Sequence, residues 1–96
     1  MKESQFQREL IKDIKALLPK AMVLKNDPSF KPGIPDLLVL HKDKWAALEV
    51  KQSATSRKRP NQEHYVDKMN SMSYASFVYP ENKEEVLNDL ERTLGA

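Results

Sequence analysis

The chain has 96 residues and a formal net charge of +2, and its 40% hydrophobic and 31% charged residues are the balance of one folded domain rather than a disordered chain. It has no cysteine, which excludes disulfides, thiolate metal ligands and cysteine nucleophiles and makes a reducing cytoplasm the expected compartment. The charged N-terminus is unlike a signal peptide, and no run reaches the about 20 apolar residues of a membrane span, so we expect no membrane association.

The first half of the chain predicts one helix and three short strands. Apolar residues recur every three or four positions at Phe6, Leu10, Ile14 and Leu17, which predicts an amphipathic helix that Pro19 ends. The segment after the first strand is rich in proline and carries a glycine, so it predicts a loop. The other two strands are apolar on both alternating faces and predict a buried hairpin. The three predicted strands are residues 21–25, 36–41 and 45–51.

The second half predicts two helices with a strand between them. Pro60 suits the first turn of a helix whose inward stripe should contain Tyr65, Met69 and Met72. Residues 75–79 predict the last strand. A C-terminal helix over residues 81–94 should turn inward Val86, Leu87, Leu90 and Leu94. The order α-β-β-β-α-β-α predicts a single α/β domain over residues 1–96, with a mixed central sheet and flanking helices.

Two acids and a lysine lie on the predicted hairpin. If residues 42–43 form a two-residue turn, Asp36 lies directly opposite Glu49 and shares its face of the sheet. A four-residue turn would leave the two acids diagonal on that face, whereas a three-residue turn would separate them. Because strand side chains alternate, Lys51 shares the face of Glu49 while Leu48 points the other way into the core.

Opposed carboxylates destabilise a sheet unless a cation compensates their charge. One or two carboxylates are the usual protein ligands of Mg²⁺, which keeps several waters for a substrate phosphate to replace. We therefore expect Asp36 and Glu49 to hold a divalent metal, with the Val50 carbonyl as a further candidate ligand and Lys51 orienting water or stabilising developing charge. The competing interpretation is a buried pairing of Glu49 with Lys51, or an Asp36 that only caps the turn after Pro35.

A basic run follows the strand that carries Glu49. Residues 51–59 carry four positive charges and no acid, while five acids gather in residues 81–91 and mask the basic character of the rest of the chain. This pattern predicts phosphate contacts by Arg57, Lys58 and Arg59. The alternative is an ordinary solvated loop.

Two outlying residues can reach the same site. Glu3 flanks the inward stripe at the start of the first helix, so it is a candidate metal ligand, although the helix dipole alone would favour an acid there. Gln62 heads the buried stripe of the second helix, where an apolar residue would be usual. It is a candidate for positioning water or phosphate, and its alternative is an ordinary polar residue of a first turn.

The motif residues also resemble a known family. Gly33-Ile34-Pro35-Asp36 followed by Glu49-Val50-Lys51 is similar to the PD-(D/E)XK nuclease signature. The resemblance is closer to the VRR-NUC group of standalone phage and bacterial nucleases, covers residues 3 to about 80, and is carried by the blocks Glu3–Gln7, 33–40, 47–51 and Gln62.

The resemblance implies a restriction-endonuclease-like αβββαβ core followed here by a C-terminal helix. It implies an Mg²⁺- or Mn²⁺-dependent DNA endonuclease with Asp36, Glu49, Lys51 and Gln62 at its catalytic centre. It also implies homodimers that act on branched DNA such as Holliday junctions, in the cytoplasm of a bacterium or a phage-infected cell. A noncatalytic DNA-binding or protein-interaction module on the same fold is the alternative, but neither would need the two acids and the lysine together.

Overall fold

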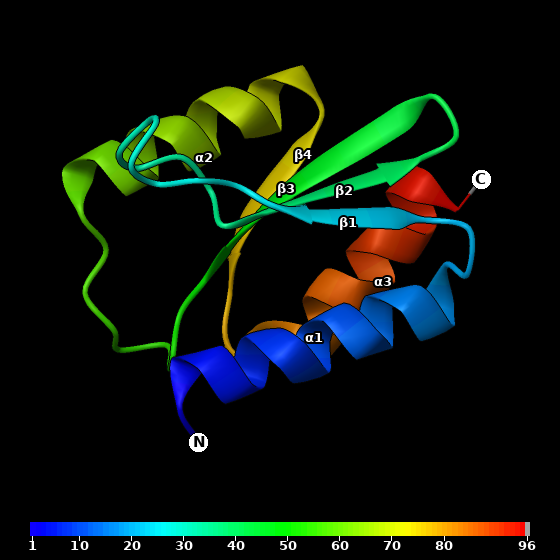
Figure 1. Cartoon of the computed structure of the whole chain (residues 1–96), viewed down its shortest axis with the longest axis horizontal. Helices are drawn as coiled ribbons and strands as arrows, with labels where there is room; N and C mark the ends of the chain where they lie inside the picture. The colour runs from blue at the N-terminus through cyan, green and yellow to red at the C-terminus, as the bar shows by residue number, and fades with distance from the viewer. Residues whose placement is uncertain (96) are drawn as a thin grey trace.

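Three helices and four strands follow one another in the predicted order in the computed structural model, which describes residues 1–95 (Figure 1). A short 3₁₀ turn (Pro80–Asn82) precedes the last helix. The elements are α1 (Glu3–Leu17), β1 (Met22–Lys25), β2 (Leu37–His41), β3 (Lys44–Val50), α2 (Pro60–Met72), β4 (Tyr74–Val78) and α3 (Lys83–Leu94).

The strands form one mixed sheet in the order β1-β2-β3-β4. Strands β1, β2 and β3 pair antiparallel, and α2 is the crossover that brings β4 parallel to β3. The β2–β3 turn has two residues, since His41 pairs with Lys44, and its first residue, Lys42, has a φ of 58° in the left-handed region. The predicted α/β class and mixed sheet are confirmed, and of the three hairpin registers considered the structure has the one with a two-residue turn.

The helices cover opposite faces of the sheet. Helices α1 and α3 pack on one face and α2 on the other (Figure 1). The larger core lies on the α1 and α3 face, where Leu48 and Val50 are 0% and 1% exposed. The core on the α2 face is small and centres on Ala47, Val66 and Ala75. Both faces of β3 are therefore covered, which positions any polar side chain of that strand in a buried setting.

Three predicted core positions need correction. Leu17 lies only at the edge of the core, and Leu18, one residue further on, is buried at the end of α1. On α2 the buried residue is Val66, whereas Met72, the last residue of the helix, is 67% exposed and lines a hollow with Leu38 and Leu40 of β2. Tyr65, expected on the inward stripe of α2, is half-buried. Within residues 1–95, no helix is long and apolar enough to cross a membrane.

Candidate active site

Asp36 is fixed at the point where β2 begins. Its Oδ2 accepts a hydrogen bond of 2.9 Å from the Val50 backbone N–H, across the hairpin. Its backbone carbonyl accepts one of 2.9 Å from the N–H of Asn26 beyond β1, and the Asn26 side chain donates to the Pro35 carbonyl at 2.8 Å. Asp36 is thus held by the chain on both sides of β2. Because its carboxylate bonds to β3 rather than to its own loop, the turn-capping interpretation does not account for it.

Glu49 is the most deeply buried acid of this site. It is 4% exposed, and Gln62 Nε2 donates to its Oε2 at 3.2 Å. Burial raises the pKa of Glu49 to about 8, and the neighbouring charge of Asp36 and a hydrogen bond with that carboxyl contribute to the rise, while Lys51 opposes it. The observed register places Asp36 opposite Glu49, so the pair is the predicted one. Without a cation, protonation of Glu49 offsets the repulsion between the two carboxyls.

Lys51 and Gln62 complete the polar cluster. The Lys51 ammonium, on a residue 9% exposed, donates to Gln62 Oε1 at 2.8 Å. The same oxygen accepts the Arg59 backbone N–H at 3.0 Å at the start of α2. Gln62 therefore links the lysine to Glu49 through the two ends of one amide. The amide fixes both charged groups, which is a more specific arrangement than the ordinary first-turn polar residue considered above.

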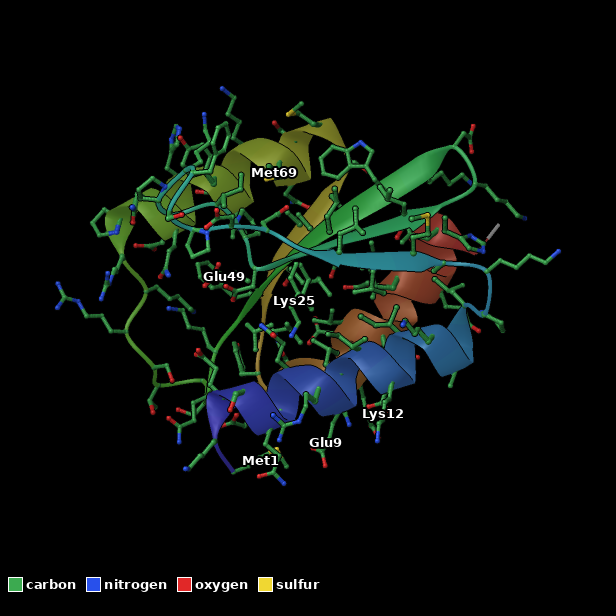
Figure 2. All side chains as sticks on the ribbon, in the orientation of Figure 1. Met1, Glu9, Lys12, Lys25, Glu49 and Met69 are labelled. Carbon is green, nitrogen blue, oxygen red and sulfur yellow. The ribbon has the colours of Figure 1, made fainter. Side chains whose placement is uncertain are left out.

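The donor set fits a divalent cation. Two carboxyls in contact, whose mutual repulsion is one cause of the raised pKa of Glu49, offer hard oxygen ligands and a negative charge that Mg²⁺ or Mn²⁺ would neutralise. Figure 2 shows Glu49 at the end of the sheet, in the region between α1 and α2. Within residues 1–95, no three Asp, Glu, His or Cys side chains gather closely enough to form a metal site by themselves. Waters and substrate oxygens would complete the coordination shell.

Glu3 stands apart from the two central acids. It is exposed at the first residue of α1, and its charge is the smallest of the effects that raise the pKa of Glu49. Glu3 is near enough to affect the pKa of Glu49, but it does not form a group of three close acids with Asp36 and Glu49. The Val50 carbonyl remains a predicted ligand, while the Val50 N–H is already used by Asp36.

The basic run divides into two kinds of residue. Arg57 and Arg59 are exposed, as predicted. Lys58 is half-buried, with its Nζ 5.0 Å from the Phe77 ring centre and 5.8 Å from that of Tyr79. Cation–π contacts with β4 and the residue after it hold Lys58 against the domain, while phosphate contacts by all three residues stay a prediction.

Sequence reasoning missed two supports of the site. Asn26 positions Asp36 through the backbone of residues 35 and 36, and an amide side chain placed directly after β1 was the available signal. The loop before α2 is ordered by its own hydroxyls, since Ser53 bonds to Thr55 and Ser56. That loop also contacts the 3₁₀ turn, because the Ala54 N–H donates to Glu81 at 3.3 Å. The arginines are therefore carried by a structured loop.

No family model and no curated protein matches the chain.

Proposed function

We propose that the protein is a metal-dependent DNA endonuclease that hydrolyses phosphodiester bonds at the cluster of Asp36, Glu49, Lys51 and Gln62. The observation that carries the proposal is that two carboxyls, an ammonium and a linking amide meet at one end of the sheet, with Glu49 and Lys51 buried. A noncatalytic module has no use for such an arrangement, because burying these charges costs free energy without any gain in stability. The resemblance of the motif residues to the VRR-NUC group supports the same proposal.

Each side chain has a distinct part in the proposed reaction. Asp36 and Glu49, with the Val50 carbonyl, would hold Mg²⁺ or Mn²⁺, which supplies water activation and neutralises charge on the phosphate when bound. Lys51 stabilises the negative charge that develops on the scissile phosphate, and its hydrogen bond to Gln62 sets the direction of its ammonium. Gln62 also fixes the Glu49 carboxyl.

DNA approaches this end of the sheet across the loop that precedes α2. Arg57 and Arg59 are exposed on that loop, close in sequence to Lys51 and Gln62, and would contact backbone phosphates. These contacts carry little sequence information, so we propose that branched or duplex DNA is recognised by shape and charge.

A homodimer is the proposed working unit, because one cluster per copy can cut only one strand at a time. On the α2 face, a hollow of about 330 Å³ is lined by Leu38, Leu40, Trp45, Met69 and Met72. The lining carries no charge, so the same surface of a second copy could meet it across a twofold axis without placing like charges together, whereas DNA would find no partner there.

Sedimentation at micromolar concentration tests the dimer. The wild type should sediment as a dimer, and Met72→Glu, which changes an already exposed side chain, should sediment as a monomer with an unchanged melting temperature. A monomeric wild type, with or without a DNA junction, would contradict the dimer.

A cleavage assay tests the activity. Single-stranded, duplex, flap and four-way-junction DNA are incubated with the protein in Mg²⁺, in Mn²⁺ and in EDTA, and the products are resolved by length. We expect cleavage only with a metal, and faster cleavage of branched DNA than of linear duplex. Binding without cleavage of any of the four DNAs would instead indicate a noncatalytic DNA-binding module.

A further inference from the structure

The loop between β1 and β2 presents an aromatic ring that the proposed chemistry does not use. Phe30 is 86% exposed, and a hollow of about 450 Å³ lies beside it. The hollow is lined by Asn26, Asp27, Phe30, Lys31 and Ile34. An exposed ring at a hollow of this size can serve as a stacking platform for a planar ligand.

This loop is anchored, so the position of Phe30 is defined. Lys31 Nζ lies 5.5 Å from the ring centre of Tyr65 on α2. Gly33 has a φ of +90°, and a Cβ at this position would lie 2.7 Å from the Asn61 side chain, so only glycine lets the loop backbone pack this closely on α2. A ligand would therefore meet a preformed surface, and little ordering of the loop would reduce its affinity.

The hollow adjoins the proposed catalytic cluster. Asn26, which lines the hollow, donates its side-chain amide to the Pro35 carbonyl and its backbone N–H to the Asp36 carbonyl. One residue thus contributes to the hollow and holds the backbone of the catalytic acid. A group bound in the hollow would therefore lie against a residue that holds the backbone at Asp36.

The chemistry of the lining favours a base over a phosphate. Hydrogen bonds from the Ser29 hydroxyl and backbone N–H, at 2.6 and 2.9 Å, lower the pKa of Asp27 and keep it anionic at neutral pH. An anion repels phosphate but accepts hydrogen bonds from the amino groups of adenine, cytosine and guanine. Phe30 adds a ring face, and Lys31, which also lines the hollow, offers a positive charge to a connecting phosphate.

We propose that this hollow is a base pocket, which takes one unpaired nucleobase stacked on Phe30 and hydrogen-bonded to Asp27. The inference rests on the proposed nuclease function and narrows its substrate to DNA with an unpaired nucleotide beside the scissile phosphate, such as a flap or an open junction arm. A base inside a duplex cannot enter, because its faces are covered by its neighbours. Thymine, which has no amino group, should bind less well than the other bases.

The test is a double substitution, in the protein and in the DNA. Affinities of the wild type, Phe30→Ala, Phe30→Leu and Phe30→Trp are measured in EDTA by fluorescence anisotropy. The DNAs are a duplex with a short single-stranded flap, the same flap built from abasic residues, and the plain duplex. Phe30→Leu is the matched control, since it keeps apolar bulk and removes the ring. The melting temperature of each variant checks its folding. Because Phe30 is exposed, its substitution should leave the melting temperature unchanged.

We expect Phe30→Ala and Phe30→Leu to weaken binding of the normal flap by about 5- to 150-fold, the range for removal of one base–aromatic stack. Phe30→Trp should restore binding, and none of the variants should change affinity for the abasic flap or the duplex. An equal loss on all three DNAs, or no loss on any, would overturn the base pocket.

Cleavage of the same flap by the wild type in Mg²⁺ is scored separately. Cleavage without a base-dependent effect of Phe30 would overturn the pocket alone. A base-dependent effect without cleavage would overturn the nuclease proposal alone. Absence of binding to all three DNAs would overturn both.

Discussion

Strand β3 is buried on both sides, but its two sides bury different chemistry. Toward α1 and α3 it presents Leu48 and Val50 to a continuous apolar core. Toward α2 it presents Glu49, and Lys51 follows it, in a cluster held by hydrogen bonds to Gln62 and beside the acid Asp36. Burial stabilises the first pair of side chains and costs free energy for the second. The comparison indicates that one face supplies the stability and the other carries the electrostatic cost of a buried polar cluster.

The largest expected effect is on the polar face and on activity. Asp36→Asn and Glu49→Gln each remove a proposed metal ligand while keeping the side-chain shape, so the proposed cleavage should fall by about 10³-fold or more. The fold should survive, since the apolar face is untouched, and circular dichroism checks this. Cleavage at the wild-type rate by either variant would show that the site is assigned wrongly.

The matching change on the apolar face should act on stability alone. Leu48→Ala leaves a cavity at a fully buried position, which should lower the free energy of unfolding by about 2–5 kcal/mol. Urea denaturation measures the loss. At a temperature where the variant is still folded, its cleavage rate should stay within a few-fold of the wild type. A loss of activity as large as that of Glu49→Gln would break the proposed separation of the two faces.

The pH dependence of stability distinguishes the faces a second time. The pKa of Glu49 rises from its ordinary 4.5 to about 8 in the folded protein, so the folded state binds the proton more tightly than the unfolded state. The contribution of Glu49 to the free energy of unfolding is therefore fully present below about pH 4.5 and is lost as the pH rises toward 8. In EDTA, Glu49→Gln should melt at a higher temperature than the wild type at about pH 8, with the difference shrinking toward about pH 5. Leu48→Ala should show no such trend relative to the wild type.

A smaller effect is expected when the linking amide is removed. Gln62→Ala leaves the Lys51 ammonium and the Glu49 carboxyl without a shared partner, so both lose their fixed orientation. The turnover rate should fall by about 10- to 100-fold, the range for removal of one outer-shell support, with little change in DNA affinity. Gln62→Glu, which preserves size but adds a third acid, should be no better. An unchanged turnover rate in both variants would favour the interpretation of Gln62 as an ordinary polar residue of the first turn.

The smallest effect concerns the basic loop, in which two arginines are exposed and the lysine between them packs on aromatic rings. Arg57→Ala with Arg59→Ala should lower the salt slope of DNA binding by about two, one for each phosphate that is no longer neutralised. Lys58→Ala should change the slope less and should lower stability by about 0.5–1 kcal/mol, because this lysine packs on the Phe77 and Tyr79 rings. Affinity measured against salt concentration checks both variants. Equal slope changes at all three positions would contradict the division.

The sequence predicted the parts of this structure that depend on local geometry. The register of the hairpin follows from a two-residue turn and the alternation of side chains, so the meeting of Asp36 with Glu49 could be foreseen. The position of Gln62 could also be foreseen, because a polar residue heading an inward stripe is unusual. The α/β class followed from the order of elements.

Features that depend on distant segments could not be predicted in this way. Asn26 supports Asp36 because β1 happens to end beside the start of β2, and Lys58 finds aromatic rings on a strand that follows α2. Met72 lines a hollow with residues of β2 instead of lying in the core, which periodicity along the helix does not encode. Tertiary contacts, rather than any local pattern, decide all three.

The tight turn at Lys42 also bears on the order of folding. The bond between Val50 and Asp36 spans only 14 residues, so the two acids are brought together by hairpin formation, an event of about 1–10 μs, before α2 and β4 need to dock. The repulsion between them is consequently present early, when no helix yet shields the hairpin. Low pH or a bound cation should therefore accelerate the earliest step of folding, which would make the pair of Asp36 and Glu49 a participant in assembling the sheet.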